Sequence, residues 1–156
     1  MSTIELTGLK GLTRKITALR DAPFRDMMLG DIGMYAMTRI KRRTLKGEDV
    51  HGLDFTPYSK GYAVERGKRD FPVKPVDLTR TGSMLSAMTY DTNRDSVDIF
   101  FMNTQGPEAP GYKNKERNPA KAFFLHQDRE FFELSQDDIK GIKDIVNDYY
   151  DKLTRG

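Results

Sequence analysis

The chain has no cysteine and no tryptophan, and only two histidines among its 156 residues. Without cysteine it forms no disulfide and offers no thiolate to a metal ion, so nothing in it demands an oxidising compartment. No apolar run approaches the roughly 20 residues that a membrane-spanning helix needs. Residues 1–15 also lack the continuous apolar stretch of a secretory signal. We therefore expect a protein that is cytosolic or is assembled in a cytosol, with no membrane partner.

Signals of catalysis are equally scarce. His51 and His126 have no second histidine at a metal-binding spacing. No glycine-rich segment has the pattern of a phosphate-binding loop, and no serine stands in a nucleophile elbow. The carboxylate pairs are Glu48-Asp49, Asp137-Asp138 and Glu130 with Glu133. They are typical of solvated loop charge or of a helix start, so we predict no catalytic residue, no metal site, no cofactor and no enzyme.

Charge is distributed unevenly along the chain. Residues 1–80 hold 16 Lys and Arg against 10 Asp and Glu, a balance of +6, whereas residues 81–156 hold 10 against 13, a balance of −3. A molecule with two unlike ends could stack head-to-tail on copies of itself or lie between unlike partners. The alternative is uneven solvated charge without a function.

Hydrophobic periodicity predicts three helices, over residues 7–20, 24–45 and 136–153. The second has five apolar residues spaced four apart: Phe24, Met28, Ile32, Ala36 and Ile40. The third follows Ser135 as N-cap, with two aspartates in its first turn. Shorter helical segments are expected within 58–67 and 83–88.

Two β-prone runs, near 88–92 and 96–102, flank Asn93-Arg94-Asp95 and predict a β-hairpin. In the second run, Val97, Ile99 and Phe101 alternate with more polar residues, as in a half-buried strand. A third strand is expected near 121–127, and long loops over 46–75 and 103–120. The expected fold is one α+β domain, in which an antiparallel sheet of three or more strands packs against two N-terminal helices and a C-terminal helix.

A basic cluster ends the second predicted helix: Arg39, Lys41, Arg42, Arg43 and Lys46. These residues are candidates for contact with a phosphate backbone, which would depend on salt and not on base sequence. No aromatic residues are interleaved with them, as they are in single-strand binders. Cations at a helix C-terminus also complement the helix dipole without binding anything.

Four motifs follow one another in a characteristic order. They are GLDFTPYSKGY at 52–62, DLTRTGSMLSAM at 77–88, NPAKAFFLHQ at 118–127 and REFFELSQDDIKGI at 129–142. In this order they resemble the phage virion morphogenesis and tail completion family of tailed phages, including Mu-like and P2-like prophages. The resemblance spans roughly residues 20–150.

Three positions depart from the family pattern. Phe55 stands where the family often has tryptophan, Glu133 where glycine is common, and Glu130 where a proline is expected. These departures leave open whether the chain is similar to tail completion proteins, tail terminators or head–tail adaptors.

The resemblance implies a structural virion protein, assembled in the host cytoplasm, that forms a ring of six or twelve copies at the head–tail neck. Its implied partners are further copies of itself, a portal or head-completion protein on one side, and a tail tube or terminator protein on the other. Packaged DNA would pass the lumen, where Arg39, Lys41, Arg42 and Arg43 are the candidate DNA-facing residues. Candidate interface residues are Phe55, Pro57, Tyr58, Thr81, Gly82, Met84, Leu85, Phe123, Phe124, Phe131 and Phe132.

Two other functions stay open from the sequence. One is a nucleic-acid-binding protein without sequence preference, which would bind DNA as a monomer with a salt dependence set by several phosphate contacts. The other is a small hydrolase with a carboxylate site at Glu48, Asp49 or Asp54, which would place one of them in a concave pocket with a raised pKa.

Overall fold

The structure, a computed structural model, describes residues 4–5, 22–105 and 117–155. Its elements in chain order are β1 (Ile4–Glu5), α2 (Ala22–Lys46), α3 (Lys60–Gly67), α4 (Ser83–Ser86), β2 (Met88–Thr92), β3 (Val97–Phe101), α5 (Asn118–Arg129) and α6 (Gln136–Arg155). The predicted α+β class is confirmed. The helix predicted over 7–20 lies outside the described residues.

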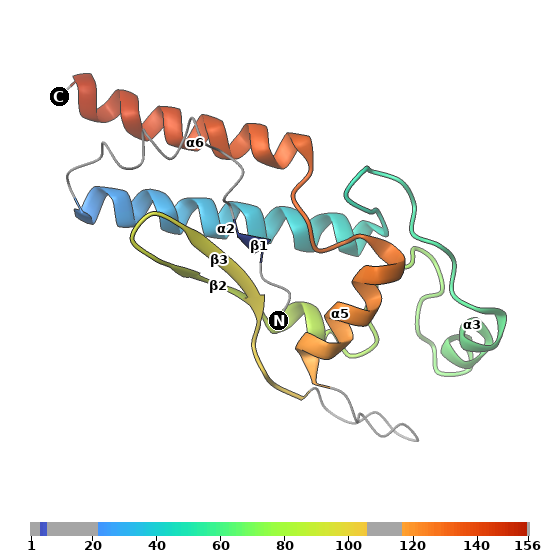
Figure 1. The fold of residues 1–156 in the computed structure, drawn as a ribbon. Helices are drawn as coiled ribbons and strands as arrows, with labels where there is room; N and C mark the ends of the chain where they lie inside the picture. The colour runs from blue at the N-terminus through green and yellow to red at the C-terminus, as the bar shows by residue number, and fades with distance from the viewer. Residues whose placement is uncertain (1–3, 6–21, 106–116, 156) are drawn as a thin grey trace.

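The two long helices, α2 and α6, run side by side in opposite directions, and the β2–β3 hairpin lies against the other side of α2 (Figure 1). The apolar spacing of α2 explains this central position. Met28, Ile32, Ala36 and Ile40 are almost fully buried, and Phe24 packs at the edge of the core. One apolar stripe of α2 thus meets both layers, as its periodicity predicts.

The hairpin forms where the sequence predicts it. β2 and β3 pair antiparallel, with Met88 opposite Phe101 and Thr92 opposite Val97. The two-residue β1 pairs with the other edge of β3, which gives the strand order β1-β3-β2. In β3, Val97, Ile99 and Phe101 are buried while the residues between them are half-exposed. This alternation is the expected result of covering one face of the strands with α2.

The strand predicted near 121–127 is wrong, because residues 118–129 form the helix α5. Pro119 stands in the first turn of α5, where its missing N–H costs no hydrogen bond. Ala122 is buried and Leu125 packs against the core, a spacing of three that fits one helical face. The short apolar run therefore has a helical contact pattern that its β-prone phenylalanines concealed.

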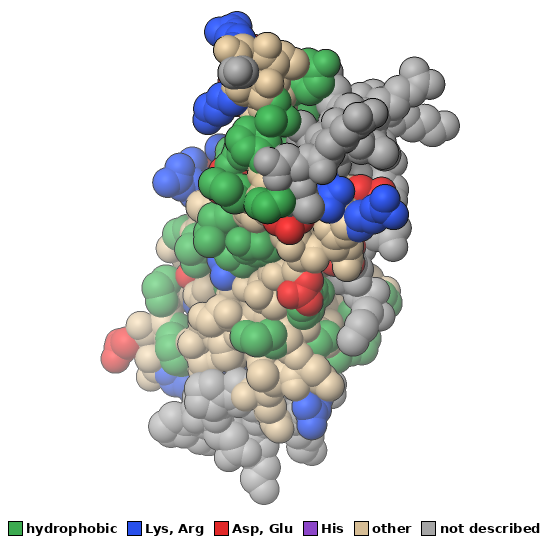
Figure 2. All heavy atoms as spheres, turned by 90° about the vertical axis from the view of Figure 1, so that its left-hand side faces the viewer, with side chains coloured by type: hydrophobic (Ala, Val, Ile, Leu, Met, Phe, Trp, Pro, Cys, Tyr) green, Lys and Arg blue, Asp and Glu red, His purple; other side chains and the backbone are tan. Residues whose placement is uncertain are grey.

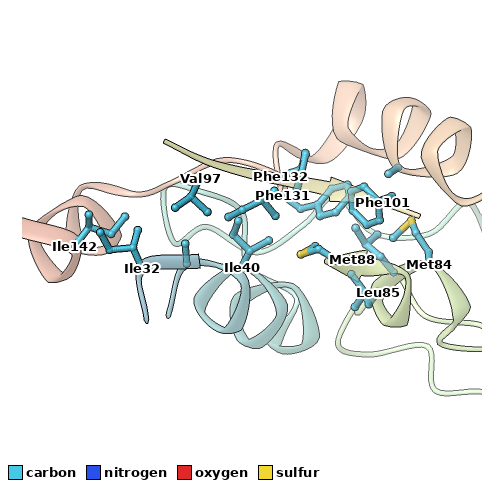
Figure 3. Close-up of a cluster of buried hydrophobic side chains, with 14 of the residues drawn as sticks. Ile32, Ile40, Met84, Leu85, Met88, Val97, Phe101, Phe131, Phe132 and Ile142 are labelled. Carbon is cyan, nitrogen blue, oxygen red and sulfur yellow. The ribbon is translucent and has the colours of Figure 1, made fainter. Parts of the chain in front are cut away.

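The core joins all these elements. Figure 3 shows Ile32 of α2 facing Ile142 of α6, and Ile40 facing the hairpin and the phenylalanines that precede α6. Phe101 lies 4.8 Å from Phe132 between ring centroids. The core residues extend through the molecule from the start of α2 to α5. Each fully buried side chain of this size adds about 1.5–3 kcal/mol to the free energy of unfolding, relative to the same side chain exposed.

Close approach of α2 to the hairpin depends on Gly33. A Cβ atom at this position would overlap the ring of Tyr90 on β2, because the ring lies directly on the glycine backbone. Gly30, one turn earlier, has open space around its Cα.

None of the described helices has an 18-residue stretch apolar enough to cross a membrane.

Candidate functional site

A pocket of about 490 Å³ opens between α3, α4 and α5. Its lining residues are Tyr58, Ser59, Tyr62, Arg66, Leu78, Thr79, Arg80, Thr81, Gly82, Ser83, Met84, Lys121, Phe124, Leu125 and Arg129. They come from three stretches, 58–66, 78–84 and 121–129, far apart in sequence. Each stretch overlaps one of the motifs that carry the family resemblance, and we therefore call this cavity the motif pocket.

Arg66 of α3 holds one wall of the motif pocket in place. Its guanidinium is buried and donates hydrogen bonds to the backbone oxygens of Pro72, at 2.8 Å, and Thr79, at 2.6 Å. The same group lies 4.7 Å from the ring centroid of Tyr58. Burial raises the pKa of Tyr58, and the Arg66 charge opposes that rise. Arg66 therefore fixes the segment before α4 against α3.

Asn118 joins the second and third motifs. It is buried at the start of α5, and its side-chain amide donates to Thr104 Oγ1 at 2.9 Å. Its carbonyl oxygen accepts from Ser83 Oγ at 3.4 Å. Gly82, just before Ser83, has a φ of +72°, a conformation that glycine adopts without strain. The Thr-Gly-Ser turn, which lines the pocket, is thus joined to the Asn-Pro start of α5 behind it.

The charged groups in the lining all have the same sign. Arg66, Arg80, Lys121 and Arg129 line the motif pocket, and no carboxylate is among its lining residues. Two carboxylates lie behind the wall: Asp77 is 3.8 Å from Arg66 and Glu65 is 3.0 Å from Arg80. The lining itself therefore carries charge of positive sign alone, which favours an anionic group at the pocket.

The rest of the lining is apolar. Leu78, Met84 and Leu125 combine with the aromatic rings of Tyr58 and Phe124. Phe124 remains 58% exposed, and its neighbour Phe123 is 48% exposed. Such side chains next to a cavity are a common feature of surfaces that bind another protein.

The predicted interface residues divide into three groups. Those exposed at the surface are Pro57, Thr81, Phe123 and Phe124, and those half-buried are Tyr58 and Gly82. Five are core residues of the subunit instead, namely Phe55, Met84, Leu85, Phe131 and Phe132. Phe55, Leu85, Phe131 and Phe132 pack inside the subunit, so the prediction that these four face a partner is corrected. Met84 is also buried, but it lines the motif pocket as well.

Two of the predicted DNA-facing residues are occupied within the chain. Arg39 Nε donates to Asp138 Oδ1 at 2.8 Å, and Arg43 Nη1 donates to Asp138 Oδ2 at 2.5 Å. Arg43 also donates to the backbone oxygen of Glu133 at 2.6 Å. Asp138 is fully buried, so these arginines join α2 to the start of α6 rather than extending toward a ligand.

Asp138 also caps its own helix, because its backbone N–H donates to Ser135 Oγ at 3.1 Å and its carboxylate accepts from the Ser135 N–H at 3.0 Å. Burial alone would raise the pKa of Asp138. The hydrogen bonds from Arg39, Ser135 and Arg43 outweigh that effect and hold the pKa below its ordinary value. Asp138 is thus a charged residue that joins α2 to the start of α6 and so has a structural role.

The remaining basic residues differ in exposure. Lys41 donates to the backbone oxygen of Met88 at 3.2 Å, and burial lowers its pKa. Arg42 and Lys46 are exposed and line a second concavity together with Glu48 and Asp137. This mixture of signs is a poor match to a phosphate backbone.

The histidines and loop carboxylates have structural contacts. His126 Nδ1 accepts from the Phe132 N–H at 3.4 Å, and His51 Nε2 lies 3.2 Å from Glu130. Asp49 Oδ1 accepts from two backbone N–H groups of its own turn. Within residues 22–105 and 117–155, no three acidic or histidine side chains cluster as metal ligands would.

Sequence reasoning missed Arg66, Asn118 and the ion pairs of Asp138. A local signal existed for only one of them: Asn118 directly precedes Pro119, a pair that indicates a helix start. The structure places Arg117 at the N-cap, and the Asn118 side chain bonds Ser83 and Thr104 instead of capping the helix. Arg66 contacts residues 6 to 13 positions away in an irregular segment, and Asp138 meets arginines 95 and 99 positions away. Contacts of this range leave no periodic pattern.

Apolar side chains are also exposed at the opposite end of the molecule. Figure 2 shows hydrophobic groups gathered on the face formed by the start of α2, the end of α6 and the hairpin turn. Near these helix ends, Met27 is 62% exposed and Leu153 is 40% exposed. The molecule therefore presents apolar surface at both ends of its long axis.

Comparison of the chain with protein-family models, curated proteins and solved structures gave no match.

Proposed function

We propose that this protein is a structural subunit of a tailed-phage virion, which assembles into a ring at the neck between head and tail. The observation that carries the proposal is the motif pocket. Three motifs that resemble the tail completion family, separated by up to about 40 residues of sequence, line one cavity beside exposed phenylalanines. A shared cavity gives the presence of these motifs in one chain a physical reason.

The arrangement of charged residues favours assembly over chemistry. Asp138, Arg39 and Arg43 hold α2 to α6, and Arg66 holds α3 to the segment before α4. Ionisable groups that serve as clamps hold a rigid shape, which a ring subunit needs in order to repeat one contact around a closed circle. Exposed apolar residues at both ends provide two different surfaces for such a contact.

The proposed ring has six or twelve copies and lies between a portal or head-completion protein and a tail tube or terminator protein. Of the residues expected to face packaged DNA, Arg42 is exposed, as is the neighbouring Lys46. Any contact with DNA in the lumen would therefore be weak and independent of sequence.

The test is the mass of the purified protein by light scattering, alone and after mixing with phage particles that lack it. A ring-sized mass, or a stoichiometric addition of copies to heads or tails, supports the neck function and fixes the symmetry. A monomer that never adds to particles contradicts it. Binding of free DNA by that monomer, with an affinity that falls steeply with salt, would favour the nucleic-acid-binding alternative instead.

A further inference from the structure

The turn at residues 49–53, here called the Leu53 turn, presents an apolar side chain to solvent. Leu53 is 65% exposed, more than any other large hydrophobic residue in the described part of the chain. It is followed by the exposed Asp54. A single exposed leucine is ordinary. The question is therefore whether specific hydrogen bonds fix the backbone so that Leu53 stays exposed.

The hydrogen bonding of the Leu53 turn answers that question. Asp49 Oδ1 accepts from the N–H groups of His51, at 2.8 Å, and Leu53, at 2.9 Å. The Asp49 N–H donates to the Leu53 carbonyl at 2.8 Å, and the Gly52 N–H donates to the Asp49 carbonyl at 3.1 Å. Leu53 is therefore held outward by four bonds within five residues.

The turn is also anchored at both sides. The Val50 N–H donates to the backbone oxygen of Glu130 at the end of α5, at 3.1 Å. Phe55, two residues after Leu53, is buried in the core. Leu53 is not among the residues that line the motif pocket. These anchors keep the turn where it is, so its leucine does not fill the pocket of its own subunit.

The motif pocket has the features that complement this turn. Its apolar wall of Leu78, Met84 and Leu125 suits a leucine side chain, and its rim carries Lys121 and Arg129, which suit a carboxylate. A phosphate backbone would gain nothing from the apolar wall, whereas a leucine next to an aspartate uses both parts. The pocket thus favours a protein segment over nucleic acid.

We propose that the Leu53 turn of one copy docks in the motif pocket of the next copy, with Leu53 against the apolar wall and Asp54 toward Lys121 and Arg129. This inference rests on the self-assembly in the proposed function. Because turn and pocket are different parts of the surface, the contact is heterologous, and repeating it generates a ring when the rotation closes.

The polarity of the contact gives a matched pair of charge variants. Lys46, on the α2 side of the turn, lines a separate concavity that neither Leu53 nor Asp54 lines. Asp54→Lys should weaken self-association because it places a cation against the cationic rim. Lys46→Glu, a charge change of the same size nearby, should leave self-association unchanged. Equal effects of the two variants would overturn the assignment of Asp54 to the pocket.

Cysteine cross-linking tests the contact directly, since the chain has no cysteine of its own. Leu53→Cys and Thr81→Cys change one exposed residue in the turn and one at the pocket. The two single variants are mixed in equal amounts, assembled and oxidised, and the disulfide-linked pairs are identified by mass. We expect the mixed 53–81 pair to dominate over 53–53 and 81–81 pairs. Thr92→Cys, exposed on the hairpin, serves as control and should not pair with Leu53→Cys.

Two blocking variants give an independent readout. Leu53→Ser removes the turn's side chain and should weaken self-association roughly tenfold to a hundredfold, the loss expected for one buried leucine. Thr81→Trp should have a similar effect by covering the pocket, whereas Thr92→Trp should have none. Mixing the Leu53→Ser and Thr81→Trp variants leaves one intact turn and one intact pocket per pair, so pairs form and assembly stops there.

The results separate the contact from the function. Ring-sized assemblies or bound particles without a 53–81 cross-link overturn the turn-and-pocket contact and leave the neck function standing. A monomer that never adds to particles removes both, and light scattering reports that result before any cross-link is made. If inorganic phosphate or free DNA binds in the pocket and Leu53→Ser leaves assembly unaffected, the contact is overturned, and the ligand of the pocket is an anion instead of a second copy.

Discussion

Asp138 is a buried carboxylate whose charge is retained because three groups stabilise it. Arg39 and Arg43 donate to it from α2, and the backbone N–H of Ser135, the residue before α6, donates to it as well. Removing a carboxylate from water costs several kcal/mol, and only partners in good geometry return that cost. Arg39 and Arg43 meet this condition because each donates to a different oxygen of the Asp138 carboxylate, so Asp138 is a strong constraint on how α2 and α6 pack.

The residue-scale prediction follows from this constraint. Asp138→Asn should lower the free energy of unfolding by about 3 kcal/mol, the lower end of the range for breaking a buried ion pair. The lower end applies because the Arg39 side chain is 39% exposed and regains water. Urea unfolding followed by circular dichroism measures the change.

A matched control for Asp138 is its neighbour on the same helical turn. Asp137 is exposed and interacts with the helix N-terminus, so Asp137→Asn should cost only about 0.3–1 kcal/mol. Equal losses from the two substitutions would show that the ion pairs with Arg39 and Arg43 contribute no stability.

At the scale of elements, α2 depends on where its glycines lie. Gly33→Ala should destabilise the protein by about 1–3 kcal/mol, because the added methyl group overlaps the Tyr90 ring and forces repacking. Gly30→Ala places the same methyl group in open space and should stabilise by about 1 kcal/mol through helix propensity. Thermal unfolding of the two variants measures both effects. Stabilisation by Gly33→Ala would mean that the hairpin moves away without cost.

The elements differ in how well their sequence predicts them. α2, α6 and the hairpin are amphipathic over many residues and bury one face each, so periodicity predicted them within a few residues. Residues 121–127 were predicted as a strand because phenylalanine is common in strands. A short apolar run fits a strand or a helix equally well, so its sequence alone does not distinguish the two. The burial of Ala122 and Leu125 in α5, a tertiary contact, decides for helix.

The candidate site was less predictable than the elements. Local motifs identified Tyr58, Thr81 and Phe124 individually, but not that they line one cavity. Their convergence depends on Arg66 and Asn118, whose partners are fixed only when α3, α4 and α5 come together. The Arg39–Asp138 contact shows the same limit, because a basic helix end looks the same in sequence whether it binds DNA or a buried carboxylate.

On the scale of the whole molecule, the two ends have different surfaces. One end carries the motif pocket with its cations, and the end where α2 begins and α6 finishes (Figure 1) carries the exposed Met27 and Leu153. Because the two ends differ, a contact that joins one end to the other end of a neighbouring copy is heterologous, and repeating it builds a ring when the rotation closes. This polarity is the property that a ring between two different partners requires.

Acid stability tests the clamp that holds this shape together. The pKa of Asp138 in the folded protein lies below the value of 3.8 that it takes when unperturbed. A depressed folded pKa adds stability above the unfolded pKa, and that stability is lost as the pH falls below 3.8 toward and through the folded pKa. The difference in unfolding free energy between the wild type and Asp138→Asn should therefore be constant near neutrality and shrink below pH 3.8. Because both proteins share every other carboxylate, the difference isolates Asp138. A difference that stays constant from neutral pH through that acid range would mean that folding does not lower the pKa of Asp138, and that its ion pairs with Arg39 and Arg43 contribute no net stability.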